Sequence, residues 1–493
     1  MVAYVPPKQA GKYKAVASGA ITNGKPVIVN STGTVSVPLP DLTQTLGSAV
    51  VYNSGATNYN RATFDSNSNR VVVAYKDEGN SNYGAAIVGT VSGTSISYGT
   101  EVVFESATTS SIDITFDSNS NRVVIAYNDS GSNLTAIVGT VDSSDNSISF
   151  GTPVVFNASG TNSISCTFDS NSNKVVITYQ DGGNSHYGTA IVGTVDSSDN
   201  SISFGSEAVF HSVSSALQDS AFDSSNNKVV ITYQAYAPPS IVSRAYAVVA
   251  TVSGTSISFG TPVDIVGAGS INNGTPIAFD SNSNKIVVIY GDSTDSTKGK
   301  AKVGTVSGTG ISFGSAVTFE SATDILYKAI AFDSSVNKVV IAYDYTETDL
   351  KYVVGTVSGT SISFGTAVVF SGGNGVGDWS LDVTFDSSNN KSVIVFRDQS
   401  NSSYGTSHVF QNASTSTLPL TSENYIGIAS GGTYADTAEA TIDVVGTVNK
   451  DQSGLTAGQT YYVQTDGTLG TSADSPSVVA GTAISATELI VKG

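Results

Sequence analysis

Carboxylates from distant parts of the chain could hydrolyse a glycosidic bond. Enzymes of that kind use one carboxyl group as the acid and a second as the base or nucleophile. Four acidic residues could supply such a pair, namely Asp113, Asp219, Asp324 and Asp382. They lie far apart in the chain and follow no motif, so we interpret them as solvated loop carboxylates. A sialidase would also need an arginine cluster, but only five arginines exist and two of them fall at tight turns.

A repeated Asp-Ser-Asn-Ser-Asn run is the second pattern with chemical potential. It stands at 65–69, 117–121, 169–173 and 280–284, and its alternate oxygen side chains could wrap a calcium ion. The three other copies of the run carry Ser at the middle ligand position, and no Glu closes the loop. Asp and Asn side chains that cap a tight hairpin explain the same residues. We predict turns, with calcium as the alternative.

The histidines and glycines indicate no catalytic centre. His408 falls in a predicted strand, and His186 and His211 lack the partners of a metal site or a catalytic triad. No Gly-rich phosphate loop follows a strand and opens a helix. We therefore predict a protein that is not an enzyme and that holds no cofactor or metal.

A Phe-Asp pair recurs along most of the chain and organises the rest of it. The steps between successive pairs are 52, 52, 54, 57, 53 and 53 residues, since the pairs stand at 64–65, 116–117, 168–169, 222–223, 279–280, 332–333 and 385–386. A period of about 50 residues is typical of propellers and other repeat arrays.

One repeat contains four predicted strands, which we call a to d. In the first repeat they span 62–64, 70–75, 85–91 and 95–104, with Gly99 as a bulge. Four antiparallel strands in each of seven repeats, with no helix between them, predict an all-β chain that forms a seven-bladed β-propeller. Strand c also carries a glycine, which we attribute to close approach of neighbouring backbones, at Gly89, Gly139, Gly193, Gly304 and Gly355.

The d strands indicate how the propeller closes. Six of them follow a Phe-Asp pair, while the seventh copy of the pattern, 47–52, precedes the first pair. The last repeat ends after its c strand near Phe410. We therefore predict that the segment 42–52 completes the last blade, which would leave no exposed sheet edge at the junction.

The two ends of the chain lie outside the repeats and resemble each other. Ser-Gly, Gly, Val and Gly-Thr recur in the same order from Ser18 to Thr34 and from Ser453 to Thr468, with equal spacing from the second glycine to the valine and on to the third glycine. We predict one small β module made of residues 1–40 and 412–493, with the propeller, 41–411, inserted between its two parts.

Composition narrows the set of partners. The 493 residues carry a formal net charge of −18, which repels nucleic acid and anionic membrane surfaces. The single cysteine, Cys166, excludes an intramolecular disulfide, and we expect it to be buried in a strand. No apolar run is long enough to span a membrane, and the first 14 residues lack a signal peptide's apolar segment, so we expect a soluble chain made without Sec export.

The terminal segments resemble a known group of proteins. SGAITNGKPVIV at 18–29 and YIGIA at 425–429 are similar to the small β modules of tailed-phage virion proteins, among them capsid decoration proteins. The repeats, with the stretch from SGLT at 453–456 to LIVK at 489–492, resemble structural proteins of marine cyanophages. The resemblance implies a protein made in the host cytoplasm and placed on the virion surface, on the tail or the capsid exterior. It also implies that the module binds other virion proteins and could form a homotrimer.

One face of the predicted propeller is expected to be free. The turns a to b and c to d share the face from which the chain leaves, and their residues repeat nearly verbatim. The loops on the opposite face differ between repeats and carry aromatic residues and arginines, which suit a recognition surface, although unconstrained drift would look the same. The predicted binding-face residues are Arg61, His186, Tyr187, Tyr236, Arg244, Tyr246, Tyr345, Tyr352, Trp379 and Arg397.

These observations favour a virion structural protein of the fibre or adhesin type that binds a glycan or protein on the host surface. The alternative is a passive decoration protein that cements the capsid. A glycan-degrading enzyme is the third and least favoured hypothesis.

Overall fold

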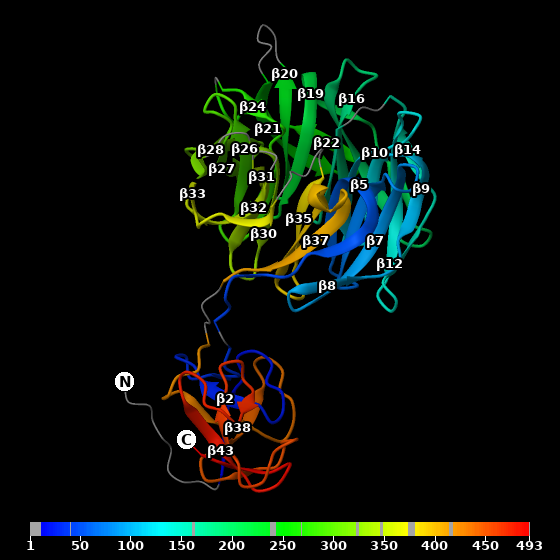
Figure 1. Cartoon of the computed structure of the whole chain (residues 1–493). Coiled ribbons are helices and arrows are strands. Elements are labelled where there is room, and N and C mark those ends of the chain that lie inside the picture. The colour runs from blue at the N-terminus through cyan, green and yellow to red at the C-terminus, as the bar shows by residue number, and fades with distance from the viewer. Residues whose placement is uncertain are drawn as a thin grey trace. The chain divides into compact units, whose positions relative to one another are not determined.

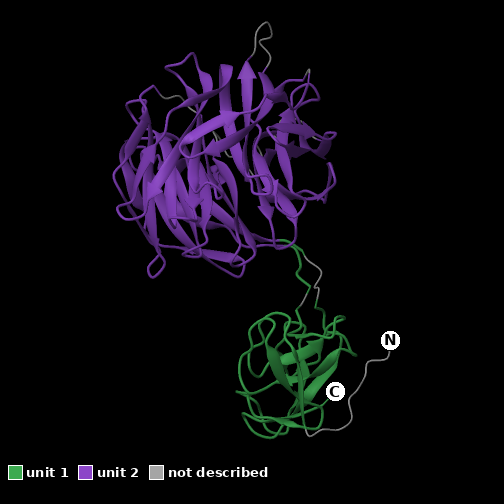
Figure 2. Ribbon diagram, turned by 180° about the vertical axis from the view of Figure 1, so that it is seen from behind, with its two compact units in different colours: residues 1–44, 412–493 green, residues 45–411 purple. Residues whose placement is uncertain are grey.

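The computed structural model describes residues 11–39, 41–159, 163–236, 243–267, 269–321, 325–345, 349–372, 380–413 and 418–492. The chain divides into two compact units, one made of residues 1–44 with 412–493 and the other of residues 45–411 (Figure 2). Within the described residues, every element is a β-strand except one short 3₁₀ helix, Gln399–Asn401. The prediction of an all-β chain is confirmed. The described part contains no helix that is long and apolar enough to cross a membrane.

The larger unit repeats one pattern of antiparallel strands (Figure 1). Each innermost strand ends at the Asp of a Phe-Asp pair, and these strands are β5 (Val50–Asp65), β10 (Ser110–Asp117), β15 (Ile164–Asp169), β19 (Ala208–Asp223), β25 (Ile277–Asp280), β30 (Ile325–Asp333) and β35 (Leu381–Asp386). Each pairs with a second strand across a tight turn, namely β6 (Arg70–Asp77), β11 (Arg122–Asn128), β16 (Lys174–Asp181), β20 (Lys228–Tyr236), β26 (Lys285–Asp292), β31 (Lys338–Tyr345) and β36 (Lys391–Asp398). The short β24 (Ile271–Asn272) also pairs with β26.

The third and fourth strands complete each sheet. The third strands are β7 (Tyr83–Ser92), β12 (Leu134–Asp142), β17 (Tyr187–Asp196), β21 (Ser243–Ser253), β27 (Lys298–Ser307), β32 (Asp349–Ser358) and β37 (Tyr404–Gln411). The fourth strand is broken near its glycine into two pieces, which are β8 (Ser95–Tyr98) with β9 (Val102–Thr108), β13 (Ser147–Phe150) with β14 (Val154–Asn157), β18 (Ser201–Phe204) with the start of β19, β22 (Ser256–Phe259) with β23 (Val263–Asp264), β28 (Gly310–Phe313) with β29 (Val317–Glu320), β33 (Ser361–Phe364) with β34 (Val368–Gly372), and β4 (Thr45–Leu46) with the start of β5.

The innermost strands form a ring. Each contacts the next one along the chain, and the last, β35, contacts the first, β5. Both β4 and the first part of β5 pair with β37, so the start of this unit shares a sheet with its end. Sheets that follow one another around an axis in this way have the architecture of a β-propeller.

Strand β6 shows why the repeats need each other. Val71, Val72 and Val73 are fully buried although they alternate between the two faces of their sheet. Val71 and Val73 pack in a cluster with residues of β36 and β37, whereas Val72 packs against β11 and β12. A run of β-branched residues is therefore covered on both sides by the neighbouring sheets.

The glycine of the fourth strand sets the spacing between sheets. A Cβ atom added at Gly151 would overlap the backbone carbonyl oxygen of Asn200, in a turn of the next sheet. The same close approach recurs around the ring, for Gly47 with Thr94, Gly99 with Asn146, Gly205 with Thr255, Gly260 with Thr309 and Gly314 with Thr360. Only a residue without a side chain fits there.

The glycines of the third strand have a different role from the predicted one. A Cβ atom at Gly89 would meet the side chains of Ile96 and Tyr98, which belong to the same sheet. The prediction that these glycines permit close approach of neighbouring backbones is therefore wrong. They make room for the large side chains of the adjacent fourth strand, and the backbone approach occurs at the fourth-strand glycines instead.

The Asp-Ser-Asn-Ser-Asn runs form turns held by their own aspartates. Oδ1 of Asp65 accepts hydrogen bonds from the backbone N–H groups of Asn67 at 2.8 Å and Ser68 at 3.0 Å. The same Asp-to-backbone bonds recur at Asp117, Asp169 and Asp280. The structure thus supports the turn interpretation.

The smaller unit packs two five-stranded sheets together. The first has the order β1 (Lys12–Val16), β39 (Glu439–Val444), β38 (Tyr425–Ala429), β2 (Pro26–Val29), β3 (Val35–Ser36), and the second the order β40 (Val448–Asn449), β44 (Leu489–Val491), β43 (Val478–Ala483), β41 (Thr460–Val463), β42 (Leu469–Gly470). Ile28 and Ile428 of the first sheet share one buried cluster with Val463 and Leu489 of the second. Both β2–β3 and β41–β42 are hairpins.

Substitution of Gly151 by alanine tests the close approach between sheets. We expect Gly151→Ala to lower the free energy of unfolding by about 1–3 kcal/mol, because the new methyl group must displace a backbone carbonyl. Gly365→Ala is the matched control, since a Cβ at this equivalent glycine would meet only the Val354 carbonyl oxygen at 3.8 Å. Equal losses for both variants in denaturant unfolding would contradict the role given to Gly151.

Candidate functional site

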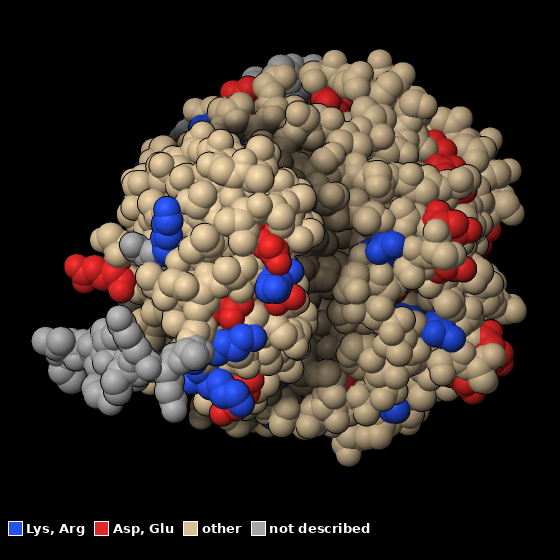
Figure 3. Space-filling model, turned by 90° about the horizontal axis from the view of Figure 1, so that it is seen from below, with Lys and Arg blue, Asp and Glu red and all other residues tan. Residues whose placement is uncertain are grey.

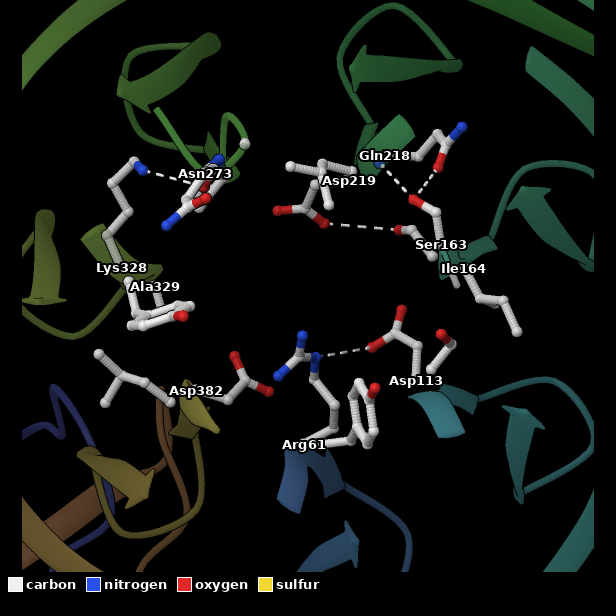
Figure 4. A pocket seen from close by; sticks show the side chains of 18 of the residues that line it. Arg61, Asp113, Ser163, Ile164, Gln218, Asp219, Asn273, Lys328, Ala329 and Asp382 are labelled. Carbon is white, nitrogen blue, oxygen red and sulfur yellow. Dashed lines mark hydrogen bonds and ion pairs between the residues drawn. The ribbon is translucent and has the colours of Figure 1, made fainter. Parts of the chain in front are cut away.

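Equivalent positions of the repeat surround one cavity at the centre of the ring. The position three residues before each Phe of a Phe-Asp pair is occupied by Arg61, Asp113, Ser165, Asp219, Pro276, Ala329 and Asp382. All of these residues line a cavity of about 150 Å³ (Figure 4). We call it the axial cavity. The repeat has the same register at each of these positions, yet the residue types differ, so the cavity combines acidic, basic and small side chains.

Three carboxylates of the axial cavity also join neighbouring sheets. In each case, one oxygen accepts a hydrogen bond from a backbone N–H of the next innermost segment. These bonds join Cys166 N to Asp113 Oδ2 at 2.6 Å, Ile277 N to Asp219 Oδ2 at 3.0 Å, and Ala62 N to Asp382 Oδ2 at 2.9 Å. The carboxylates are therefore fixed in position without a ligand.

Arg61 places a positively charged guanidinium group in the cavity. Figure 4 shows its guanidinium group directed into the cavity between Asp113 and Asp382, with Asp219 on the opposite side. Its Nε lies 3.8 Å from Oδ1 of Asp113, and one terminal nitrogen donates to the backbone oxygen of Asn60 at 2.9 Å.

The ionisation of the three carboxyl groups is shifted by their surroundings. Burial raises the pKa of Asp113 to about 7 against the opposing effect of Arg61, and Asp219 and Asp382 raise it slightly further. Burial likewise raises the pKa of Asp219 to about 6 and raises that of Asp382. A small change in pH near neutrality thus changes the charge of the cavity.

Lys328 is the second basic residue of the lining, but its amine is occupied. Nζ donates to the backbone oxygens of Asn272 at 2.9 Å, Asn273 at 3.0 Å and Leu326 at 3.2 Å. Figure 4 shows the side chain turned toward Asn273. Burial lowers the pKa of this amine to about 7. Lys328 ties together the backbone of the cavity wall.

The cavity rim carries left-handed backbone. Tyr59, Ser111 and Leu217 stand at the same position of three repeats and have φ angles of 52°, 49° and 54°. In a fourth repeat this position is Gly274, with φ 78°. Positive φ is uncommon for residues with large side chains and costs about 1–3 kcal/mol. At Tyr59, Ser111 and Leu217 the pairing of the innermost strand with the second strand of its sheet shifts register. The innermost strand is therefore irregular at these residues, and Tyr59 and Leu217 line the cavity.

The structure corrects one interpretation of the acidic residues. Asp113, Asp219 and Asp382 are not solvated loop carboxylates, because they lie within strands, are partly buried and line one cavity together. Their common distance from the Phe-Asp pair was the signal that could have identified them. Asp324, the fourth candidate, lies outside the described residues.

Of the described residues predicted for the binding face, only Arg61 lines the axial cavity. Tyr236 is 46% exposed at the end of β20, and His186 is exposed beside the half-buried Tyr187. Arg244 forms an ion pair with Asp264 at 3.0 Å, and Arg397 lies 3.4 Å from Glu78.

Three predicted tyrosines are engaged by neighbouring side chains. Tyr246 stacks on Tyr233, with 5.8 Å between ring centroids. Tyr345 lies under the amine of Lys351, at 3.4 Å from the ring centroid. Tyr352 is only 4% exposed and packs on Phe370 and Phe410, so its assignment to the binding face is wrong. It lies in β32, where a buried aromatic residue fills the space between sheets. Trp379 lies outside the described residues.

Comparisons with known proteins address the fold. No protein-family model matches the chain, and no curated protein matches it in sequence. Among solved structures, the chain is similar to the BP39L lectin from Burkholderia pseudomallei, with 11% identity, a TM-score of 0.56, and coverage of 74% of this chain and 98% of the lectin. A protein of unknown function from Dyadobacter fermentans is 8% identical, with a TM-score of 0.46 and coverage of 75% and 99%. At such low identity the likeness to the lectin concerns the fold alone.

Substitution of Asp113 by asparagine tests the burial of this carboxyl group. The folded chain keeps the proton up to about pH 7, whereas the unfolded chain releases it near pH 4. The stability that this group contributes is therefore complete below pH 4 and is lost as pH rises to about 7. Asp113→Asn cannot ionise, so the decline in unfolding free energy between pH 4 and 7 should shrink by on the order of 1 kcal/mol or more.

Asp142→Asn is the control for this measurement. Asp142 is exposed, and hydrogen bonds from Ser144 lower its pKa, so its loss should leave the decline between pH 4 and 7 as it is. Denaturant unfolding of both variants and the parent chain across that pH range provides the comparison. A parent-like profile for Asp113→Asn would show that the carboxyl group does not hold its proton in the folded chain.

Proposed function

We propose that this chain is a structural protein of a tailed-phage virion that binds a carbohydrate on the host surface without cleaving it. In this proposal, the sheets of the larger unit form a seven-bladed β-propeller, which is inserted into a small module built by both termini. The module holds the chain on the virion through other virion proteins, and it could do so as a homotrimer. The binding unit is the propeller.

The observation that carries the binding role is the axial cavity. Carboxylate and guanidinium groups from separate repeats converge there on one cavity, and convergent polar groups in a concave site are typical of small-molecule binding. Sugars present hydroxyl groups that both donate and accept hydrogen bonds, so they match carboxylates and arginine together. The fold likeness to the BP39L lectin supports this role.

The loops around the cavity would extend the contact to a larger glycan. Tyr236 offers an exposed aromatic face, and Arg244 is held in place by Asp264. Aromatic and arginine side chains on a rigid scaffold contribute most to many binding surfaces. The resemblance of the terminal segments to phage modules supports the virion location.

The hydrogen bonds of the carboxyl groups suit a binding role. Asp113, Asp219 and Asp382 each accept a backbone N–H that joins two sheets, and their oxygens have further lone pairs that can accept from a ligand. Their arrangement suits acceptors that stay in place.

The purified full chain should bind cyanobacterial cells and at least one saccharide on a glycan array. The double variant Tyr236→Ala/Arg244→Ala should lose about tenfold in cell binding if the loops extend the contact, because two rigid contact groups are removed. Lys174→Ala, at a turn of the repeated type, is the control. New reducing ends released from host glycan would contradict the non-enzymatic role, and absence of both cell and array binding would favour passive decoration.

A further inference from the structure

We infer that the axial cavity binds a single uncharged sugar ring, whose hydroxyl groups donate to Asp113, Asp219 and Asp382 and accept from Arg61. This inference rests on the proposed function. It adds the chemical class of the ligand and the place in the fold where that ligand binds.

The mixture of charges selects against ionic ligands. An anionic group in the cavity would face three carboxyl groups, while a cationic group would face the guanidinium of Arg61 between Asp113 and Asp382 (Figure 4). An ion of either sign would be attracted by one kind of group and repelled by the other, so the repulsion offsets part of the attraction. An uncharged ligand with donors and acceptors satisfies both kinds of group.

The size and walls of the cavity match one ring. A volume of about 150 Å³ corresponds to about five water molecules at the ~30 Å³ that each takes up in the liquid, which is the scale of a single sugar ring. Apolar surface alternates with the polar groups, since Tyr59, Leu217, Tyr327 and Leu381 also line the cavity. The C–H faces of a sugar ring would pack against those side chains.

The binding groups are already in place. Backbone N–H donors hold the carboxylates of Asp113 at 2.6 Å and Asp382 at 2.9 Å, and the Asn60 carbonyl accepts from Arg61. Groups fixed before binding lose little freedom when a ligand arrives. The bonds that join the sheets therefore also prepare the cavity for a ligand.

Calorimetric titration of the full chain with single sugars tests the inference. The neutral probes are glucose, galactose, mannose and fucose, and the charged probes are glucuronate and glucosamine. We expect at least one neutral sugar to bind with one site per chain, and the charged sugars to bind at least tenfold more weakly. Ala329→Leu, which fills the cavity at a small lining residue, and Arg61→Gln should each weaken binding at least tenfold.

Arg122→Gln is the matched control. Arg122 donates from Nε to Asn200 Oδ1 at 2.6 Å in a turn and is absent from the cavity lining, so its loss should change affinity less than twofold. Thermal unfolding establishes that each variant is folded.

The outcomes separate this inference from the proposed function. If the chain binds a glycan on the array but no single neutral sugar, or if Ala329→Leu and Arg61→Gln bind as the parent does, the ligand binds elsewhere and the inference is overturned while the function stands. Tighter binding of glucuronate or glucosamine overturns the ligand class. If no saccharide binds at all, both fail.

Discussion

The larger unit depends on how closely each sheet can approach the next. At the fourth-strand glycines, a backbone carbonyl of the neighbouring turn occupies the space where a side chain would be, as Gly151 and Asn200 illustrate. The same approach between Gly47 and Thr94 joins the start of the unit to its first complete sheet. Aromatic rings reinforce the contact, since Phe104 of one sheet packs on Tyr127 of the next, with 5.1 Å between centroids. Charged residues make up only 13% of the chain, and the face seen in Figure 3 is mostly uncharged, so close packing contributes much of the contact between sheets.

Some positions of the repeat build the sheets, and one position builds the axial cavity. Positions filled by the same residue type in most repeats, such as the Phe-Asp turn and the fourth-strand glycine, build the sheets and their spacing. The position three residues before each Phe is filled by different residues, and this variation makes a cavity with distinct chemical groups from an otherwise regular ring. The carboxyl groups of Asp113, Asp219 and Asp382 serve both the sheets and the cavity. Each joins two sheets and also lines the cavity. Strain at Tyr59 and Leu217 is found at the rim of this cavity, as is common for functional sites.

The sequence was sufficient for features that a local pattern determines. Short β-branched strands, Asp-capped turns and the order of four strands within a repeat follow from turn chemistry and β-branched runs, and the all-β class is confirmed. The role of the third-strand glycines was predicted wrongly. A recurring glycine indicates that there is no room for a side chain, but it does not indicate which neighbouring atoms occupy that space. Tyr352 was assigned to the surface because loop-flanking aromatics look alike in sequence, whether they point to solvent or between sheets.

The axial cavity could not be predicted by considering one acidic residue at a time. Asp113 and Asp382 are more than 250 residues apart in the chain, and only closure of the ring brings them beside Arg61. Alignment of the repeats on their Phe-Asp pairs would have placed Asp113, Asp382 and Arg61 at the same position of the repeat. It would not have shown that the side chains at this position point to the axis of the ring. A crystal structure of the full chain grown with the neutral sugar that it binds would test the account most directly. We predict sugar density in the axial cavity within hydrogen-bond distance of Arg61 and at least two of the three aspartates; a sugar bound only at the loops or between sheets, with water in the cavity, would contradict it.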